Sequence, residues 1–68
     1  MKPISGKRMC QVLKKQGWKH VRTKGSHHSF KKTGHVATII VPVHGNKDLK
    51  PGTQRAIMND AGLTDEDL

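Results

Sequence analysis

The apolar positions near the N-terminus recur every three or four residues: Met9, Val12 and Leu13. The positions around them in residues 7–16 are mostly lysine, arginine or glutamine, so the apolar side chains gather on one face of a helix. Ser5 can cap the start of this helix, and Gly17 suits its end. The pattern therefore predicts a helix from about residue 6 to residue 16.

After this helix the alternation of side chains changes to a period of two, which is typical of β-strands. The segment WKHVRTK (18–24) predicts a first strand and HHSFKK (27–32) a second. Gly25 and Ser26 between them predict a tight hairpin turn, because glycine adopts positive φ freely. The segment VATIIVP (36–42) is the most β-branched part of the chain and predicts a third, best-buried strand.

A second helix is predicted over residues 51–62, with Pro51 in its first turn and Gly62 at its end. Thr64 and Asp67 stand three residues apart and can cap one further short turn. We therefore predict an α+β fold of order α-β-β-β-α, formed as a single domain by the whole 68-residue chain. Its three-stranded antiparallel sheet should carry both helices on one face, which leaves the other face open.

Two adjacent histidines, His27 and His28, begin the second predicted strand. Successive side chains of a strand point to opposite faces of the sheet. Phe30 is the one large apolar residue of this strand, so it should face the helices together with His28. We expect His28 to be a partly covered structural residue. His27, Ser29 and Lys31 should then point to the open face.

The formal net charge is +8, and its distribution is uneven. All Lys and Arg residues except Lys50 and Arg55 lie within residues 1–47, a segment without any Asp or Glu; all five acids follow it. A self-repelling basic surface is stabilised by a polyanion, most often a phosphate backbone. Solubility alone also favours lysine-rich surfaces. The acidic tail TDEDL either stays solvated or lies against the basic face.

The single cysteine, Cys10, excludes an internal disulfide and agrees with a reducing compartment. Its place in a packed helix favours a small core residue. No apolar run reaches the ~20 residues of a membrane span, and no signal peptide is visible. We expect a cytoplasmic protein without a membrane partner. A chain of 68 residues buries too little surface to enclose a deep pocket, so it should act at its surface.

Two blocks of the sequence resemble the HicA family of toxin messenger-RNA interferases, which belong to bacterial and archaeal toxin–antitoxin pairs. The blocks are GWKHVRTKGSHHSF (17–30) and VPVHGNKDLKPGTQRAIMNDAGL (41–63). The first carries the family pattern G-W…R…G-S-H-x-x-F at Gly17, Trp18, Arg22, Gly25, Ser26, His27 and Phe30. The second carries V-P-x-H, K-x-L, G-T-x-R and A-G-L, and matches the family at Val41, Pro42, His44, Lys47, Leu49, Gly52, Thr53, Arg55, Ile57, Ala61, Gly62 and Leu63.

The resemblance implies a fold similar to the double-stranded-RNA-binding domain. It also implies ribonuclease activity on RNA without a metal or other cofactor, one essential histidine, and inhibition by a HicB-like antitoxin. The catalytic histidine of the family lies in the G-S-H segment, which corresponds here to His27.

The chemistry of RNA cleavage suits these residues. RNA carries its own nucleophile, the 2′-hydroxyl, and histidine exchanges protons readily because its unperturbed pKa is about 6.5. Cationic side chains stabilise the charge that develops on the phosphate. Beside the candidate catalytic residue His27, the candidate substrate-binding residues are Arg22, Lys24, Gly25, Ser26, Lys31 and Lys47. Ser26 either orients His27 or only completes the turn.

Other functions require different residues. The five histidines fit no zinc-binding spacing, so we predict no metal site. Trp18 is expected in the core rather than as a platform for RNA bases. The alternative function is a non-catalytic RNA-binding module, which needs the basic start of the second helix but not His27. A third is a regulatory protein that docks an acidic partner.

Overall fold

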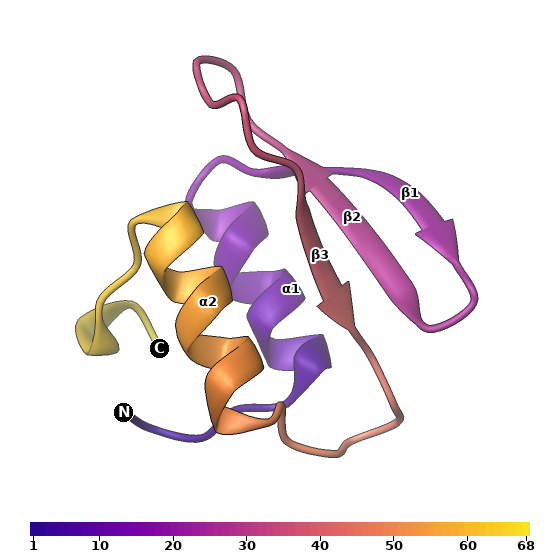
Figure 1. Cartoon of the computed structure of the whole chain (residues 1–68), viewed down its shortest axis with the longest axis vertical. Coiled ribbons are helices and arrows are strands. Elements are labelled where there is room, and N and C mark those ends of the chain that lie inside the picture. The colour runs from indigo at the N-terminus through magenta and orange to yellow at the C-terminus, as the bar shows by residue number, and fades with distance from the viewer.

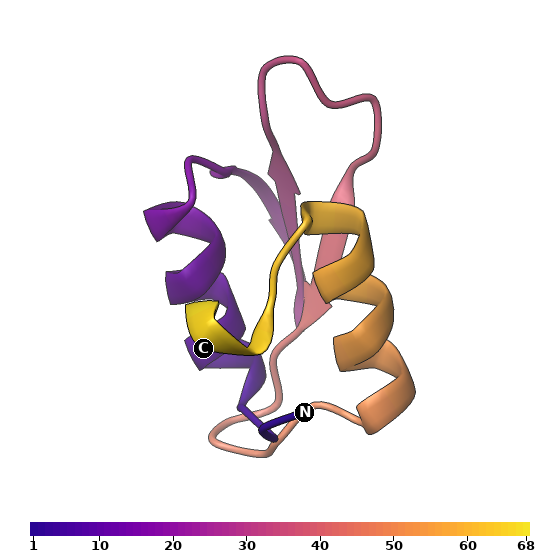
Figure 2. The same cartoon turned by 90° about the vertical axis from the view of Figure 1, so that its left-hand side faces the viewer.

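The computed structural model describes all of residues 1–68. Its elements are α1 (Gly6–Lys15), β1 (Lys19–Lys24), β2 (His27–Lys31), β3 (Ile39–Pro42), α2 (Pro51–Ala61) and a 3₁₀ turn, η1 (Asp65–Asp67) (Figure 1). The strands form one antiparallel sheet in the order β1-β2-β3. Both helices pack on the same face of this sheet (Figures 1 and 2). The predicted α+β fold is confirmed, and none of the helices has the length and apolar character that crossing a membrane requires.

Local signals set the ends of α1, as the sequence predicts. The Ser5 hydroxyl accepts a hydrogen bond from the backbone N–H of Arg8 at 3.0 Å, which satisfies a donor that no helical carbonyl can reach. Gly17 follows the last turn with φ at +96°, in the region that glycine adopts without strain. The chain then turns back toward the sheet and buries Trp18 between the layers.

The core lies between the helices and the covered face of the sheet. It is made of thirteen apolar residues: Ile4, Met9, Cys10, Val12, Leu13, Trp18, Phe30, Ile39, Val41, Leu49, Ile57, Met58 and Leu63. The expected core positions of Cys10 and Trp18 are thus confirmed. Desolvation raises the pKa of the Cys10 thiol above its ordinary value, an effect that the positive charge of Lys14 partly offsets.

The third strand is shorter than predicted. The sequence suggests a strand over 36–42, but β3 begins at Ile39, and the Val36 side chain is fully exposed. The cause is register, because Ile39 pairs with Phe30 near the end of β2. Beyond Phe30 only Lys31 remains of β2, so the residues before Ile39 have almost no strand left to pair with. Within β3 the alternation is as expected, since Val41 is buried while Ile40 is about half exposed.

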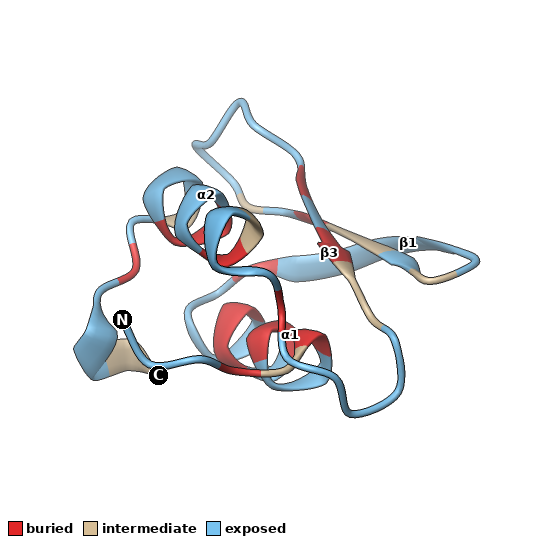
Figure 3. Cartoon of the chain, turned by 60° about the horizontal axis from the view of Figure 1, so that its bottom comes forward, coloured by how far each residue is buried: buried red, intermediate tan, exposed pale blue.

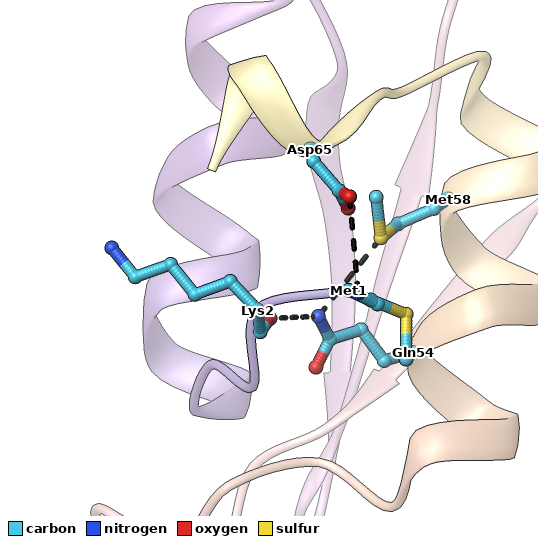
Figure 4. A network of polar contacts seen from close by, with 5 residues as sticks. All are labelled: Met1, Lys2, Gln54, Met58 and Asp65. Atoms are coloured by element: carbon cyan, nitrogen blue, oxygen red, sulfur yellow. Dashed lines mark hydrogen bonds and ion pairs between the residues drawn. The ribbon is translucent and has the colours of Figure 1, made fainter.

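The N-terminal segment is held against α2 by one buried amide, that of Gln54 (Figure 4). Its Oε1 accepts from the backbone N–H of Ile4 at 3.1 Å, and its Nε2 donates to the carbonyl of Lys2. The carbonyl of Ile4 in turn accepts from the N–H of Leu49 at 2.8 Å. These bonds fix the start of α1 relative to α2.

The acidic tail lies against the N-terminal part of the chain rather than against the open sheet face. The Nε2 of Gln16 donates to Asp67 at 3.3 Å, and the N-terminal amino group lies 3.8 Å from the carboxylate of Asp65. Thr64 and Asp67 form the predicted capping box of η1. The tail therefore leaves the basic residues of the sheet without an acidic partner from their own chain.

Candidate nucleic-acid interface

The β1–β2 hairpin extends beyond the helices and is mostly exposed (Figure 3). Gly25 begins its two-residue turn with φ at +57°, while Ser26 keeps a negative φ, which is the pattern of a type II′ turn. The carbonyl of Ser26 accepts from the N–H of Val43 at 2.8 Å, so the turn is tied to the chain just after β3. The turn is therefore held by β1 and β2, which it joins, and by the residue that follows β3.

His27 lies on the open face of the sheet, next to this turn. It pairs with Lys24 of β1 on one side and with Pro42 of β3 on the other, and its side chain is exposed. Arg22 pairs with Ser29, two residues further along β2. Since directly paired residues share a face, Arg22 and Lys24 lie on the same surface as His27.

The charge on this face is positive and uncompensated. The one ion pair of the structure joins the N-terminal amino group to Asp65, far from the hairpin in the sequence. Arg22 and Lys24 are exposed and form no ion pair with a carboxylate. Two cations beside an exposed imidazole make a surface that attracts a phosphate group and can stabilise charge developing on it.

Lys31 shares the open face but lies at the opposite end of β2. It pairs with Lys19, four residues along the strand from His27, which corresponds to about 13 Å at the usual rise per residue. Lys31 therefore lies on the same face as His27, as expected, but is not next to it. It forms a second basic position, with Lys19, along the same face.

Lys47 lies neither beside His27 nor beside Lys31, because it belongs to the loop between β3 and α2. There it lines an open groove of about 490 Å³ at the start of α2, together with Pro42, His44, Asp48, Leu49, Lys50 and Thr53. Pro42 is the link to the hairpin, since it pairs with His27. The groove that contains Lys47 therefore adjoins the hairpin at Pro42, but Lys47 itself does not lie on the sheet face.

His28 occupies different surroundings from His27, as predicted. Its side chain is half-buried on the helix side of the sheet, and its ring lies beside that of His20, with 5.4 Å between the ring centroids. Nothing in the sequence indicates that His20 and His28 lie together. A β-bulge between His20 and Arg22 shifts the register, so that His20 pairs with Phe30 while Arg22 pairs with Ser29. Regular alternation would have placed His20 and Arg22 on one face.

No group of three or more His, Cys, Asp or Glu side chains comes together in a way that could hold a metal ion. The neighbours that His27 does have are basic residues and the backbone of a tight turn. Their arrangement suits an anionic polymer lying across the hairpin.

A family model described as the HicA toxin of bacterial toxin–antitoxin systems matches residues 6–63, from the first residue of α1 to just beyond α2. The match includes every residue of the sheet and of the hairpin. Among curated proteins, no sequence matches the chain.

Proposed function

The chain belongs to the HicA family of toxins of bacterial toxin–antitoxin systems, and we propose that it is an endoribonuclease that cleaves messenger RNA in the cytoplasm with His27 as its catalytic residue. The observation that carries the proposal is the position of His27. It is an exposed imidazole beside a rigid turn, on a sheet face where Arg22 and Lys24 are the nearest charged residues of β1.

The reaction needs little from the protein. His27 accepts the proton of the 2′-hydroxyl as its oxygen bonds to the adjacent phosphorus, and the bond from phosphorus to the 5′-oxygen breaks. The imidazolium that results then gives this proton to the departing 5′-oxygen. Arg22 and Lys24 stabilise the extra negative charge of the pentacoordinate phosphate. The expected products carry a 2′,3′-cyclic phosphate and a 5′-hydroxyl.

The surrounding residues have positioning roles. Gly25 carries no side chain at the tip of the hairpin, and a Cβ built there meets nothing within 4 Å, so the RNA backbone can approach the turn closely. The carbonyl of Ser26 is engaged by Val43, which supports a role in holding the turn. With one proton-transfer group, the rate enhancement from acid–base catalysis should be roughly 10²- to 10⁴-fold.

The reaction type is tested with a single-stranded RNA in excess EDTA. We expect cleavage to survive the chelator, and to disappear when every ribose is replaced by 2′-deoxyribose, because the nucleophile is then missing. Mass spectrometry should find the cyclic phosphate. Cleavage of the deoxy strand, or loss of all activity in EDTA, would contradict the mechanism. Retention of RNA without cleavage would support the non-catalytic RNA-binding module instead.

Membership of a toxin–antitoxin family implies an antitoxin, and we propose a HicB-like protein that covers the open sheet face. The face has no lid of its own, so inhibition has to come from another chain. It combines basic residues with two apolar side chains, Val21 and Ile40, each 52% exposed. An acidic inhibitor would associate quickly with such a face, and burial of Val21 and Ile40 would stabilise the complex.

Competition between RNA and the antitoxin tests this interface. The two should exclude each other, and the backbone amide NMR signals of residues 22–31 should shift when either binds. Simultaneous binding of both, with inhibition retained, would show an allosteric block rather than occlusion.

A further inference from the structure

A second groove lies on the helix side of the sheet, between α1 and the β1–β2 hairpin. Its volume is about 440 Å³, and it is lined by Lys7, Cys10, Gln11, Lys14, His20, His28, Phe30 and Val43. Two of these side chains are lysines and two are histidines, and none carries a carboxylate. The groove is separate from the open face, because His27 and His28 point to opposite sides of β2.

The two histidines of this groove are held in place by their neighbours. The ring of His20 lies 5.4 Å from that of His28 and 5.4 Å, edge-on, from that of Phe30. The hydroxyl of Thr23 lies 2.6 Å from Nε2 of His20, and Thr23 itself pairs with His28 across the strands. These contacts orient both imidazoles before any ligand arrives.

The helix contributes the fixed charges. Lys7, Gln11 and Lys14 follow one another at spacings of four and three residues, so they form one stripe along α1. This stripe faces the groove, whereas Lys15, the next residue, does not line it. Two ammonium groups and two imidazoles thus face one concave space without a carboxylate. An anion placed there would relieve the repulsion between the two ammonium groups and could accept hydrogen bonds from the imidazole N–H groups.

We infer that this groove binds a phosphodiester of the RNA strand, at a second site on the helix side of the sheet, through Lys7, Lys14, His20 and His28. This inference rests on the proposed function, in which the same strand lies across His27. The hairpin tip makes the two sites continuous. His27 and His28 are consecutive residues beside the turn, so a strand passing over Gly25 and Ser26 leaves the open face and enters the groove.

A matched pair of variants tests the site. Lys14→Gln and Lys15→Gln remove the same charge from neighbouring exposed positions of α1, but only Lys14 lines the groove. The probe is a single-stranded RNA with 2′-O-methyl groups, which binds but has no free nucleophile. We expect Lys14→Gln to weaken binding roughly tenfold, as for the loss of a charge-assisted contact. The slope of log Kd against log salt should fall by about one for this variant and stay unchanged for Lys15→Gln.

The imidazole NMR signals give a second, independent measurement. The ring signals of His20 and His28, which both line the groove, should move on addition of the methylated RNA. Equal weakening by the two lysine variants, or unmoved His20 and His28 signals, would overturn the site. Signals that respond to polyglutamate but not to RNA would also overturn it, since the groove would then suit an acidic protein.

The methylated probe separates this inference from the proposed function. If natural RNA is never cleaved but the probe still distinguishes Lys14→Gln from Lys15→Gln, the phosphate site stands and the ribonuclease proposal fails. If natural RNA is cleaved with the same KM by Lys14→Gln and the parent, the ribonuclease proposal stands and the phosphate site fails.

Discussion

His27 and His28 are consecutive in the chain, yet their side chains lie on opposite faces of the sheet. His27 is exposed opposite Lys24, while His28 is half-buried on the side of the helices, opposite Thr23. The alternation of a β-strand produces this separation. It places two residues of identical chemistry in different surroundings, one in solvent at the hairpin and one in a groove against α1.

Substitution of each histidine should therefore have a different effect. His27→Ala should lower RNA cleavage by roughly 10²- to 10⁴-fold and leave the unfolding temperature almost unchanged, because the side chain is exposed. His28→Ala should lower the unfolding temperature and retain cleavage at saturating RNA. Cleavage assays and thermal unfolding followed by circular dichroism measure both. A fully active His27→Ala together with a folded but inactive His28→Ala would reverse the assignment.

RNA binding should depend steeply on salt. The open face and the groove carry basic residues without acidic partners, so a bound strand releases the counterions of several phosphates. Lys24→Gln, which removes a charge opposite His27, should reduce the slope of log Kd against log salt by about one. Lys2→Gln, an exposed charge at the N-terminus, is the control and should leave the slope unchanged. Binding that is insensitive to salt would remove the electrostatic basis of the site.

Gly6 should not tolerate a side chain. A Cβ at this position would overlap the carbonyl oxygen of Pro42, so α1 begins in direct contact with the end of β3. Gly6→Ala should destabilise the protein by about 1–3 kcal/mol, the usual cost of overpacking. Gly52→Ala is the matched control, because a Cβ there meets nothing within 4 Å, and helix propensity should make it neutral or slightly stabilising. Urea denaturation of both variants measures the difference.

Gln54 should be difficult to replace with an apolar residue of similar size. Gln54→Leu keeps the volume but leaves the N–H of Ile4 and the carbonyl of Lys2 without their partner. The N–H of Ile4 is buried, and leaving it unsatisfied costs about 1–3 kcal/mol, so the free energy of unfolding should fall by about this amount. Gln16→Leu, which removes only an exposed hydrogen bond to Asp67, should have a small effect. Equal losses in the two variants would show that burial of the amide is unimportant.

Cys10 should make stability fall at alkaline pH. Its pKa is raised by desolvation in the folded state, whereas in the unfolded chain the thiol ionises near its ordinary pKa of about 8.5. Its contribution is therefore fully present below that value and is lost as the pH rises toward the folded pKa. Cys10→Ala should show a smaller decrease in unfolding free energy between pH 8 and pH 10. Identical pH profiles would show that the thiol does not contribute.

The sequence by itself determines the elements and the face of most side chains. Ser5 and Gly17 set the ends of α1 through local hydrogen bonds and backbone sterics, and Gly25 sets the hairpin turn. The opposite surroundings of His27 and His28 follow from strand alternation and from the position of Phe30. All of these depend on interactions within a few residues, which is why a pattern along the chain is sufficient to predict them.

Only the tertiary structure decides the register of the strands and what lies across them. The bulge between His20 and Arg22 moves His20 to the side of His28, and the pairing of Ile39 with Phe30 shortens the third strand. The same packing brings Lys7 and Lys14 of α1 to the groove beside His20 and His28. These features depend on which residues of distant segments meet when the sheet and helices pack, and the periodicity of one segment carries no information about its partner.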